Sequence, residues 1–177
     1  QKARAYDELG RTEEAMETMQ SLIAANPHSA HYDEIQFRRG EYFFTRRKFG
    51  DAEPAYSAVI GLGPDSSYYE FALYKLGWTL YKQEFYDEAQ RRFMALLDYK
   101  VSTGYDFDQK HEEDEERRVA DTFRVISLGF SNLGGPDVVR EYFAGNGRRG
   151  YEDRIYANLG EFYLGKLRYD DAARTYR

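Results

Sequence analysis

Small residues recur along this chain at a fixed spacing of 37 residues. Three kinds of residue share the spacing: Ala15, Ala52 and Ala89; Gly40 and Gly77; Pro27 and Pro64. Self-similarity at a period of about 20–50 residues is the signature of repeat proteins, in which each repeat packs on its neighbours. The spacing therefore predicts an array of stacked repeats, to which the usual relation between chain length and domain number does not apply.

Residues 68–99 indicate what one repeat contains. Two sets of apolar or small residues each fall on one face of a helix: Leu73, Leu76, Gly77 and Leu80; then Ala89, Phe93, Leu96 and Leu97. Residues 83–87 offer no continuing apolar stripe between the two sets. The pattern predicts two helices joined by a tight turn, which close on each other as an antiparallel hairpin.

The residues of this hairpin resemble the tetratricopeptide repeat. That family's pattern places a Leu-Gly pair and an aromatic residue on the first helix, then Ala and an aromatic residue on the second, and ends on a proline. The matching residues are Leu73, Leu76, Gly77, Tyr86, Ala89 and Phe93. The resemblance implies an all-α fold, a right-handed solenoid of antiparallel helix-turn-helix repeats.

The repeats are longer than the family period of about 34 residues. The stretch from each proline to the following glycine spans 13 residues, about three more than in the usual pattern. The added residues are predicted to form an extra turn at the start of each first helix, with Ser29 or Ser67 as the cap and Ser67 with Glu70 as a capping box. Such longer repeats are similar to bacterial cell-envelope arrays, including outer-membrane assembly lipoproteins and Tol-Pal accessory proteins. That likeness favours a periplasmic or outer-membrane location, and a cytoplasmic one stays open.

The period fails after Lys100, which divides the chain into three parts. Residues 1–100 hold a truncated repeat and two complete ones, residues 101–118 form an acidic insertion, and residues 119–177 hold a degenerate repeat and a truncated one. We interpret the chain as a piece of a longer array, because both ends cut through a repeat.

Three further residues mark expected helix limits. Tyr6 is predicted to close a first helix before a turn near Gly10, and Ala172 is predicted to lie in the second helix of an unfinished hairpin. Pro54 is expected in the first turn of its helix, where the missing N–H has no intrahelical partner.

No residue pattern predicts catalysis, a metal site or a cofactor. His111 and Glu112 begin like a zinc-protease helix, but Glu115 stands where the second histidine is needed. The acidic residues of the insertion lack the glycine and ligand spacing of a calcium loop, and they fit a solvated helix start better. The glycines at 145, 147 and 150 follow no strand and precede no Gly-Lys-Ser/Thr, so they form no phosphate loop. We therefore expect a protein that is not an enzyme.

The composition of the chain limits the classes of partner that it is expected to bind. The net charge of −6 argues against nucleic acid, and no apolar run approaches the roughly 20 residues of a membrane span. The densest basic patch is interpreted as a solvated helix face or as an anchor for an acidic partner segment: Arg38, Arg39, Arg46, Arg47 and Lys48.

Aromatic residues, 17% of the chain, form a second stripe on the helix that carries Leu73 and Leu76. The stripe is Phe71, Tyr74, Trp78 and Tyr81. The resemblance implies that such positions line a concave groove, and that stacked repeats add Phe37, Phe44, Phe123 and Phe130 to it. These eight residues are predicted to bind a protein or peptide segment. The alternative is that the rings pack against the insertion or against each other.

Two functions follow. The first is a non-catalytic protein–protein interaction scaffold that holds a peptide or protein segment in the groove. The second is a structural segment that self-associates, for example through its truncated ends, or docks on the rest of a larger multi-repeat envelope protein.

Overall fold

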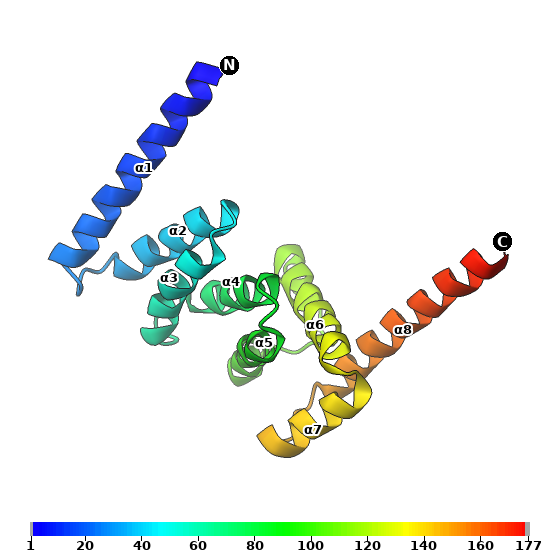
Figure 1. The fold of residues 1–177 in the computed structure, drawn as a ribbon. Coiled ribbons are helices and arrows are strands. Elements are labelled where there is room, and N and C mark those ends of the chain that lie inside the picture. The colour runs from blue at the N-terminus through cyan, green and yellow to red at the C-terminus, as the bar shows by residue number, and fades with distance from the viewer. Residues whose placement is uncertain (1, 176–177) are drawn as a thin grey trace. The chain divides into compact units, whose positions relative to one another are not determined.

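The structure, a computed structural model, describes the backbone of residues 2–175 and the side chains of residues 11–166. Over that range the chain contains helices and turns and no strand (Figure 1). The helices are α1 (Lys2–Ala25), α2 (Tyr32–Thr45), α3 (Phe49–Gly61), α4 (Tyr69–Lys82), α5 (Tyr86–Ser102), α6 (Glu113–Leu133), α7 (Pro136–Asn146) and α8 (Glu152–Thr175). The predicted all-α fold of helical hairpins is confirmed.

The helices form two compact units, Gln1–Thr79 and Leu80–Arg177. The boundary lies inside α4, so this helix contributes residues to both. The first unit contains α1, α2, α3 and most of α4, and the second contains α5 to α8.

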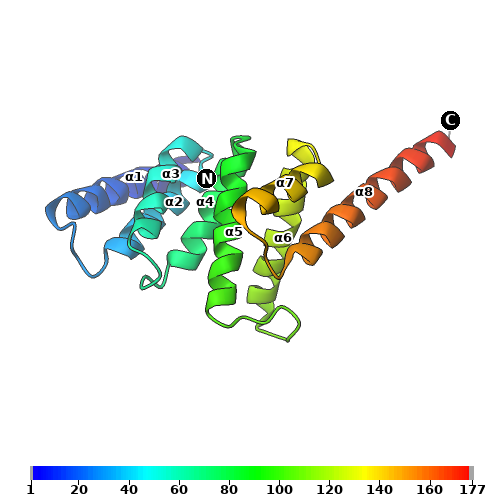
Figure 2. The same ribbon diagram turned by 90° about the horizontal axis from the view of Figure 1, so that it is seen from below.

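In the first unit, α2 and α3 lie side by side as a hairpin (Figure 2). Ala52, Ala55, Tyr56 and Val59 of α3 are buried and form its core. Gly40 of α2 lies directly against the Tyr56 ring, where an added Cβ would come within 2.5 Å of a ring carbon. The close approach of the two helices therefore depends on the absence of a side chain at position 40.

The turn between α2 and α3 recurs 37 residues later between α4 and α5. Arg47 and Glu84 hold the same place in the two turns, and both have a positive φ, 60° and 65°. In each turn the next amide donates to a carbonyl five residues back, Lys48 to Phe43 at 2.9 Å and Phe85 to Leu80 at 3.0 Å. The two helices and the turn predicted over residues 68–99 are present, and all of the predicted apolar positions are buried.

The linkers before α2 and α4 are also equivalent, and they correct the predicted helix caps. The Ser29 hydroxyl accepts a hydrogen bond from the amide of His31 at 3.3 Å. Ser66, 37 residues later, accepts one from the amide of Tyr68 at 3.2 Å. Both serines lie three residues before their helix begins, so they stabilise a turn of the linker and cap no helix. The predicted caps at Ser29 and Ser67 are therefore wrong.

Pro54 lies inside α3 and not in its first turn, which corrects the prediction for this residue. The helix begins earlier, at Phe49, because the Lys48 carbonyl already accepts a hydrogen bond from the Ala52 amide at 3.1 Å. Proline has no N–H to offer the Gly50 carbonyl four residues back. Both Pro54 and Gly50 are exposed, so water satisfies that carbonyl at little cost.

The two terminal helices run through the turns that were predicted near Gly10 and before Ala172. Gly10 lies 37 residues before Arg47, so it holds the place of the left-handed turn residue. That conformation costs an ordinary L-residue about 1–2 kcal/mol and glycine little, so backbone strain is not the obstacle at this position. A turn needs apolar burial to favour it, and no side chain of residues 11–25 is buried. The side chains of Tyr6 and Ala172 lie outside the described residues.

The second unit packs α5 to α8 around large apolar side chains: Phe93, Phe130, Phe143, Ile155 and Leu159, all nearly fully buried. Polar side chains are also buried in this unit, among them Gln90, Thr122 and Ser127. Gln90 of α5 is 1% exposed and donates to the Ile126 carbonyl of α6 at 2.6 Å. Gly129 faces this amide, where an added Cβ would approach within 2.9 Å. A missing side chain on α6 thus makes room for a hydrogen bond between the two helices.

Candidate functional site

Five of the predicted groove residues lie in the first unit and form what we name the aromatic surface: Phe37 and Phe44 on α2, with Phe71, Tyr74 and Trp78 on α4. Ring contacts connect the two helices. The Phe37 ring lies 5.1 Å from the Tyr68 ring and 6.3 Å from the Phe71 ring, measured between centroids. Aromatic pairs at such distances attract each other beyond their burial. Phe37 therefore joins α2 to the beginning of α4.

A charged pair covers the other end of the aromatic surface. The Lys75 ammonium lies 3.7 Å from the centroid of the Phe44 ring and 3.4 Å from a carboxylate oxygen of Glu41. Glu41 also accepts a hydrogen bond from the buried Tyr56 hydroxyl. Burial raises the pKa of Tyr56 far above its ordinary value, and the Glu41 carboxylate adds to this, so the hydroxyl keeps its proton. These contacts fix the Phe44 ring from three helices.

The rings of the aromatic surface are partly open to solvent. Phe71 is 38% exposed, and Phe37, Phe44, Tyr74 and Trp78 are half-buried. The Tyr74 and Trp78 rings meet edge to face, with centroids 6.4 Å apart. A helix that buries Leu73 and Leu76 on one face thus presents three aromatic rings on another. The arrangement offers a rigid, largely apolar contact area.

The other three predicted groove residues belong to the second unit, and two of them lie in its core. Phe130 is 0% exposed and Phe123 is 5% exposed, so neither presents a surface to a partner. The Phe107 ring, from the insertion, packs on Phe123 at 5.4 Å. Tyr81 remains half-buried, with its ring 5.2 Å from Tyr86. For Phe123, the alternative of packing against the insertion describes the structure.

Comparison with known families supports the hairpin geometry. Residues 1–67 match the tetratricopeptide repeat model. This first part of the chain is therefore similar to tetratricopeptide repeats. Such repeats generally mediate interactions between proteins, and the family is typically non-catalytic. A search of the curated proteins finds no match.

The segment of α4 and α5, Tyr69–Ser102, lies outside the matched range, although it carries the fuller set of residues that resemble the family pattern. Its turn, its linker serine and its glycine position repeat those of the matched hairpin 37 residues earlier. The structure thus continues the repeat beyond residue 67.

Groups that could perform chemistry are engaged in structural contacts. The His111 ring stacks on the Tyr105 ring at 3.8 Å, and its Nε2 contacts the Asp106 carbonyl at 2.6 Å. Glu115 accepts a hydrogen bond from Lys100 at 2.8 Å. Among the side chains that the structure describes, no three His, Asp or Glu residues are grouped to hold a metal ion. Over the same residues, no helix has the length and hydropathy of a membrane span.

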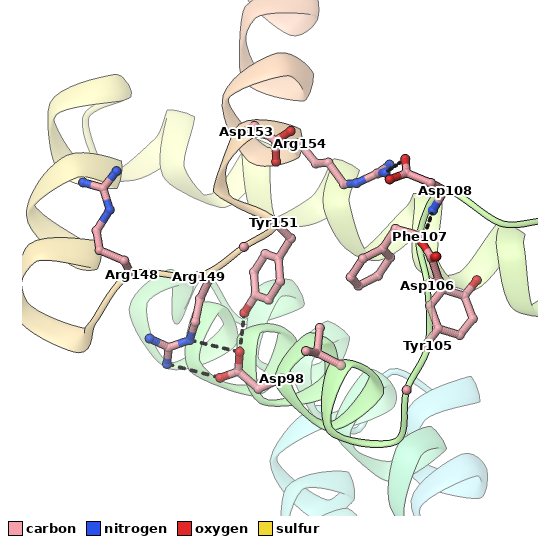
Figure 3. A pocket seen from close by; sticks show the side chains of 13 residues that line it. Asp98, Tyr105, Asp106, Phe107, Asp108, Arg148, Arg149, Tyr151, Asp153 and Arg154 are labelled. Carbon is pink, nitrogen blue, oxygen red and sulfur yellow. Dashed lines mark hydrogen bonds and ion pairs between the residues drawn. The ribbon is translucent and has the colours of Figure 1, made fainter.

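A cleft of about 560 Å³ opens in the second unit, between the end of α5, the insertion and the beginning of α8 (Figure 3). Asp98 lies at its base. The Asp98 carboxylate accepts hydrogen bonds from the Tyr151 hydroxyl at 2.6 Å and from two nitrogens of Arg149 at 3.0 and 3.2 Å. The third guanidinium nitrogen of Arg149, Nη1, donates to the carbonyls of Asn146 and Gly147. Arg149 therefore fixes the loop before α8 to α5.

These contacts change the protonation behaviour of the two donors. The hydrogen bond to Asp98 raises the pKa of Arg149 above its ordinary value. Burial, followed by the same carboxylate, raises the pKa of Tyr151. Both groups keep their protons and stay hydrogen-bond donors.

This cleft was not predicted from the sequence. Arg149 and Asp98 are 51 residues apart and belong to different repeats, and periodicity carries no information on such pairs. The one signal was the glycine-rich stretch at residues 145–150, which was tested only as a phosphate loop.

Proposed function

We propose that this chain is a non-catalytic scaffold that binds a peptide or protein segment on the aromatic surface. The proposal depends on one observation: Phe71 is 38% exposed and is contiguous along α4 with the half-buried Tyr74 and Trp78. Clustered aromatic rings of this kind are typical of energetically important interface positions.

The charges around the aromatic surface suggest how a partner would be oriented. Lys75 and Glu41 lie beside the Phe44 ring and balance each other. Neither sign dominates, so the contact area is supplied by the rings, and the partner is expected to present apolar or aromatic side chains. Arg38, 63% exposed and paired with Glu34 on the exposed side of α2, is available to adjust its direction.

Trp78, the only tryptophan of the chain, provides the test. Peptides selected from a random library on the immobilised full chain should change the emission of Trp78 when they bind. Trp78→Ala should weaken their binding by about 2 kcal/mol or more, as expected for an aromatic anchor. Phe71→Ala should weaken it as well.

Tyr156→Ala is the matched control, because Tyr156 on α8 is an aromatic residue of nearly the same exposure, 37%, outside the aromatic surface. Selected peptides that bind Trp78→Ala as well as the parent chain, without changing tryptophan emission, would refute this assignment.

Exposed apolar residues on the terminal helices support the second candidate, docking on another chain or self-association. Leu22 of α1 is 50% exposed and Leu164 of α8 is 59% exposed. Sedimentation velocity over a range of concentrations distinguishes the two functions. A chain that stays monomeric throughout would rule out self-association and leave the aromatic surface as the binding site.

A further inference from the structure

The insertion contains a segment that lies across the second unit, which we name the strap: residues 103–110 of the loop between α5 and α6. Its beginning is fixed to α5, because the Tyr105 amide donates to the Lys100 carbonyl at 3.0 Å. Its far side is fixed by His111, whose ring stacks on Tyr105. The Lys100 ammonium, from a side chain only 3% exposed, lies 4.5 Å from the Tyr105 ring centroid.

The centre of the strap inserts one aromatic ring into a notch. The Phe107 ring lies 5.4 Å from Phe123 of α6 and 6.1 Å from Tyr151, and those two rings are 6.1 Å from each other. All three pairs meet edge to face. Arg154 of α8 places its guanidinium 5.5 Å from the Phe107 centroid and pairs with the Asp108 carboxylate (Figure 3). A ring and the following carboxylate are thus held by one notch and one arginine.

The strap separates two cavities. The cleft of about 560 Å³ lies on one side, and a second cavity of about 390 Å³ lies on the other. Tyr105, Phe107 and Arg154 line both of them. Both linings mix apolar and polar side chains: Val101 lies beside Asp98 and Arg149 in the first cavity, and Val119 and Phe123 lie beside Glu116 and Asn158 in the second. Without the strap, the two cavities would be one groove along α5, α6 and α8.

We propose that this groove is a second binding site, and that it takes a partner segment in which an aromatic residue is followed by an acidic one, in competition with the strap. The strap itself supplies the argument, since Phe107 and Asp108 occupy the notch as such a segment would. Two charged residues at the cleft bear on the acidic residue of a partner: Arg148, 81% exposed, pairs with the Glu152 carboxylate, and Asp153 also lines the cleft, so Arg154 is the cation expected to select the acidic residue. Asp98 is already neutralised by Arg149 and Tyr151.

The two contacts of the strap differ in strength. Asp108 is 87% exposed, and an ion pair so open to water contributes little to affinity. The buried notch supplies most of the binding, and Arg154 supplies direction and selectivity. A partner must also displace a segment that is tethered at both ends, and a short tether gives an effective concentration on the order of millimolar. The intact chain should bind such a partner weakly, and a chain with a weakened strap should bind it tightly.

A fluorescent synthetic peptide with the sequence of residues 103–110 is the probe, and fluorescence anisotropy measures its binding to the full chain. The variant Phe107→Ala empties the notch. It should bind the peptide at least about tenfold more tightly than the parent chain, because the tethered competitor is removed. Lys110→Ala changes an exposed residue of the strap that lines neither cavity, and it should bind like the parent chain.

Two changes to the Phe107–Asp108 pair of the peptide test which side-chain contacts are responsible for its binding. A peptide that carries Phe107→Ala should lose binding to the opened chain. A peptide that carries Asp108→Lys should bind more weakly, and the further change Arg154→Glu in the opened chain should restore it. Rescue by charge reversal is not expected if the strap only supports the fold.

Circular dichroism checks that Phe107→Ala keeps its helices, and a chain with residues 103–110 replaced by eight Gly and Ser residues is the second opened variant. Equal peptide binding by the parent and opened chains, or indifference to the peptide's phenylalanine, would overturn the proposal. Loss of helicity in both opened variants would also overturn it and make the strap structural. A concentration-dependent dimer of the parent chain would overturn the choice of a separate partner, and would identify the strap of a second copy as the occupant.

Discussion

The α2–α3 hairpin and the region from α5 to α8 are stabilised by different kinds of contact. In the hairpin, helices that are neighbours in sequence meet through apolar side chains, and Gly40 lets the Tyr56 ring approach. From α5 to α8, polar pairs connect distant residues, such as Asp98 with Arg149, 51 residues away. The repeat period holds in the first region and into α5, and it fails after Lys100. Where the period provides no standard contact between successive helices, individual charged and aromatic pairs take its place.

The largest effect should come from removing a core ring that the sequence placed in a groove. Phe130→Ala should lower the free energy of unfolding by about 3–5 kcal/mol, since the ring is 0% exposed. Phe71→Ala removes a ring that is 38% exposed and should cost less than about 1 kcal/mol. Denaturant unfolding followed by circular dichroism measures both. Similar costs for the two changes would mean that both rings have the same role, against the distinction between core and surface.

Adding one methyl group tests the close approach in the hairpin. Gly40→Ala should cost about 1–3 kcal/mol, because its Cβ would overlap the buried Tyr56 ring. Gly129→Ala in α6 should cost less, because the atoms it meets are the end of the flexible Gln90 side chain. Gly50→Ala, in α3, meets no atom within 4 Å and is the control. It should leave stability unchanged or raise it by up to about 1 kcal/mol. If the three single substitutions changed the free energy of unfolding equally, the packing described for Gly40 would be contradicted.

The smallest expected effect is on the pH dependence of stability, and it involves only the polar contacts between α5 and α6. A hydrogen bond from Lys100 lowers the pKa of Glu115 in the folded chain. A carboxylate with a lowered pKa stabilises the fold above its ordinary pKa, about 4.3, and this contribution is lost as the pH falls through the folded value. The stability difference between the parent chain and Glu115→Gln should therefore be present at pH 7 and shrink as the pH falls below about 4.3.

Glu113→Gln, at an 87% exposed position of the same helix, is the control for this pH dependence and should change stability little at either pH. A pH-independent cost of Glu115→Gln would show that its charge does not contribute.

The sequence predicted the parts of the fold that repeat. The hairpin at residues 68–99 followed from apolar faces at helical spacing, and the structure buries those positions. The terminal helices were predicted wrongly, because Gly10 favours a turn locally but only burial of the following helix would stabilise one. Two of the eight predicted groove residues were placed wrongly as well. Phe123 and Phe130 hold groove positions in the repeat pattern, yet the ring of Phe107 covers the first and the core encloses the second. The side chains of an insertion are positioned by contacts with residues dozens of positions away, and a local repeat period does not predict such contacts.

The repeated turn shows that backbone conformation and side-chain charge can vary independently at one position of the repeat. Arg47 and Glu84 share a backbone conformation and the same pair of backbone hydrogen bonds, but their side chains have opposite charges and both are exposed. The turn therefore sets no requirement on charge at that position. Substitutions there can alter the charge of each turn while its backbone geometry is inherited unchanged. Evolution can thus vary the charge presented by one repeat at a time, without first having to compensate for lost stability.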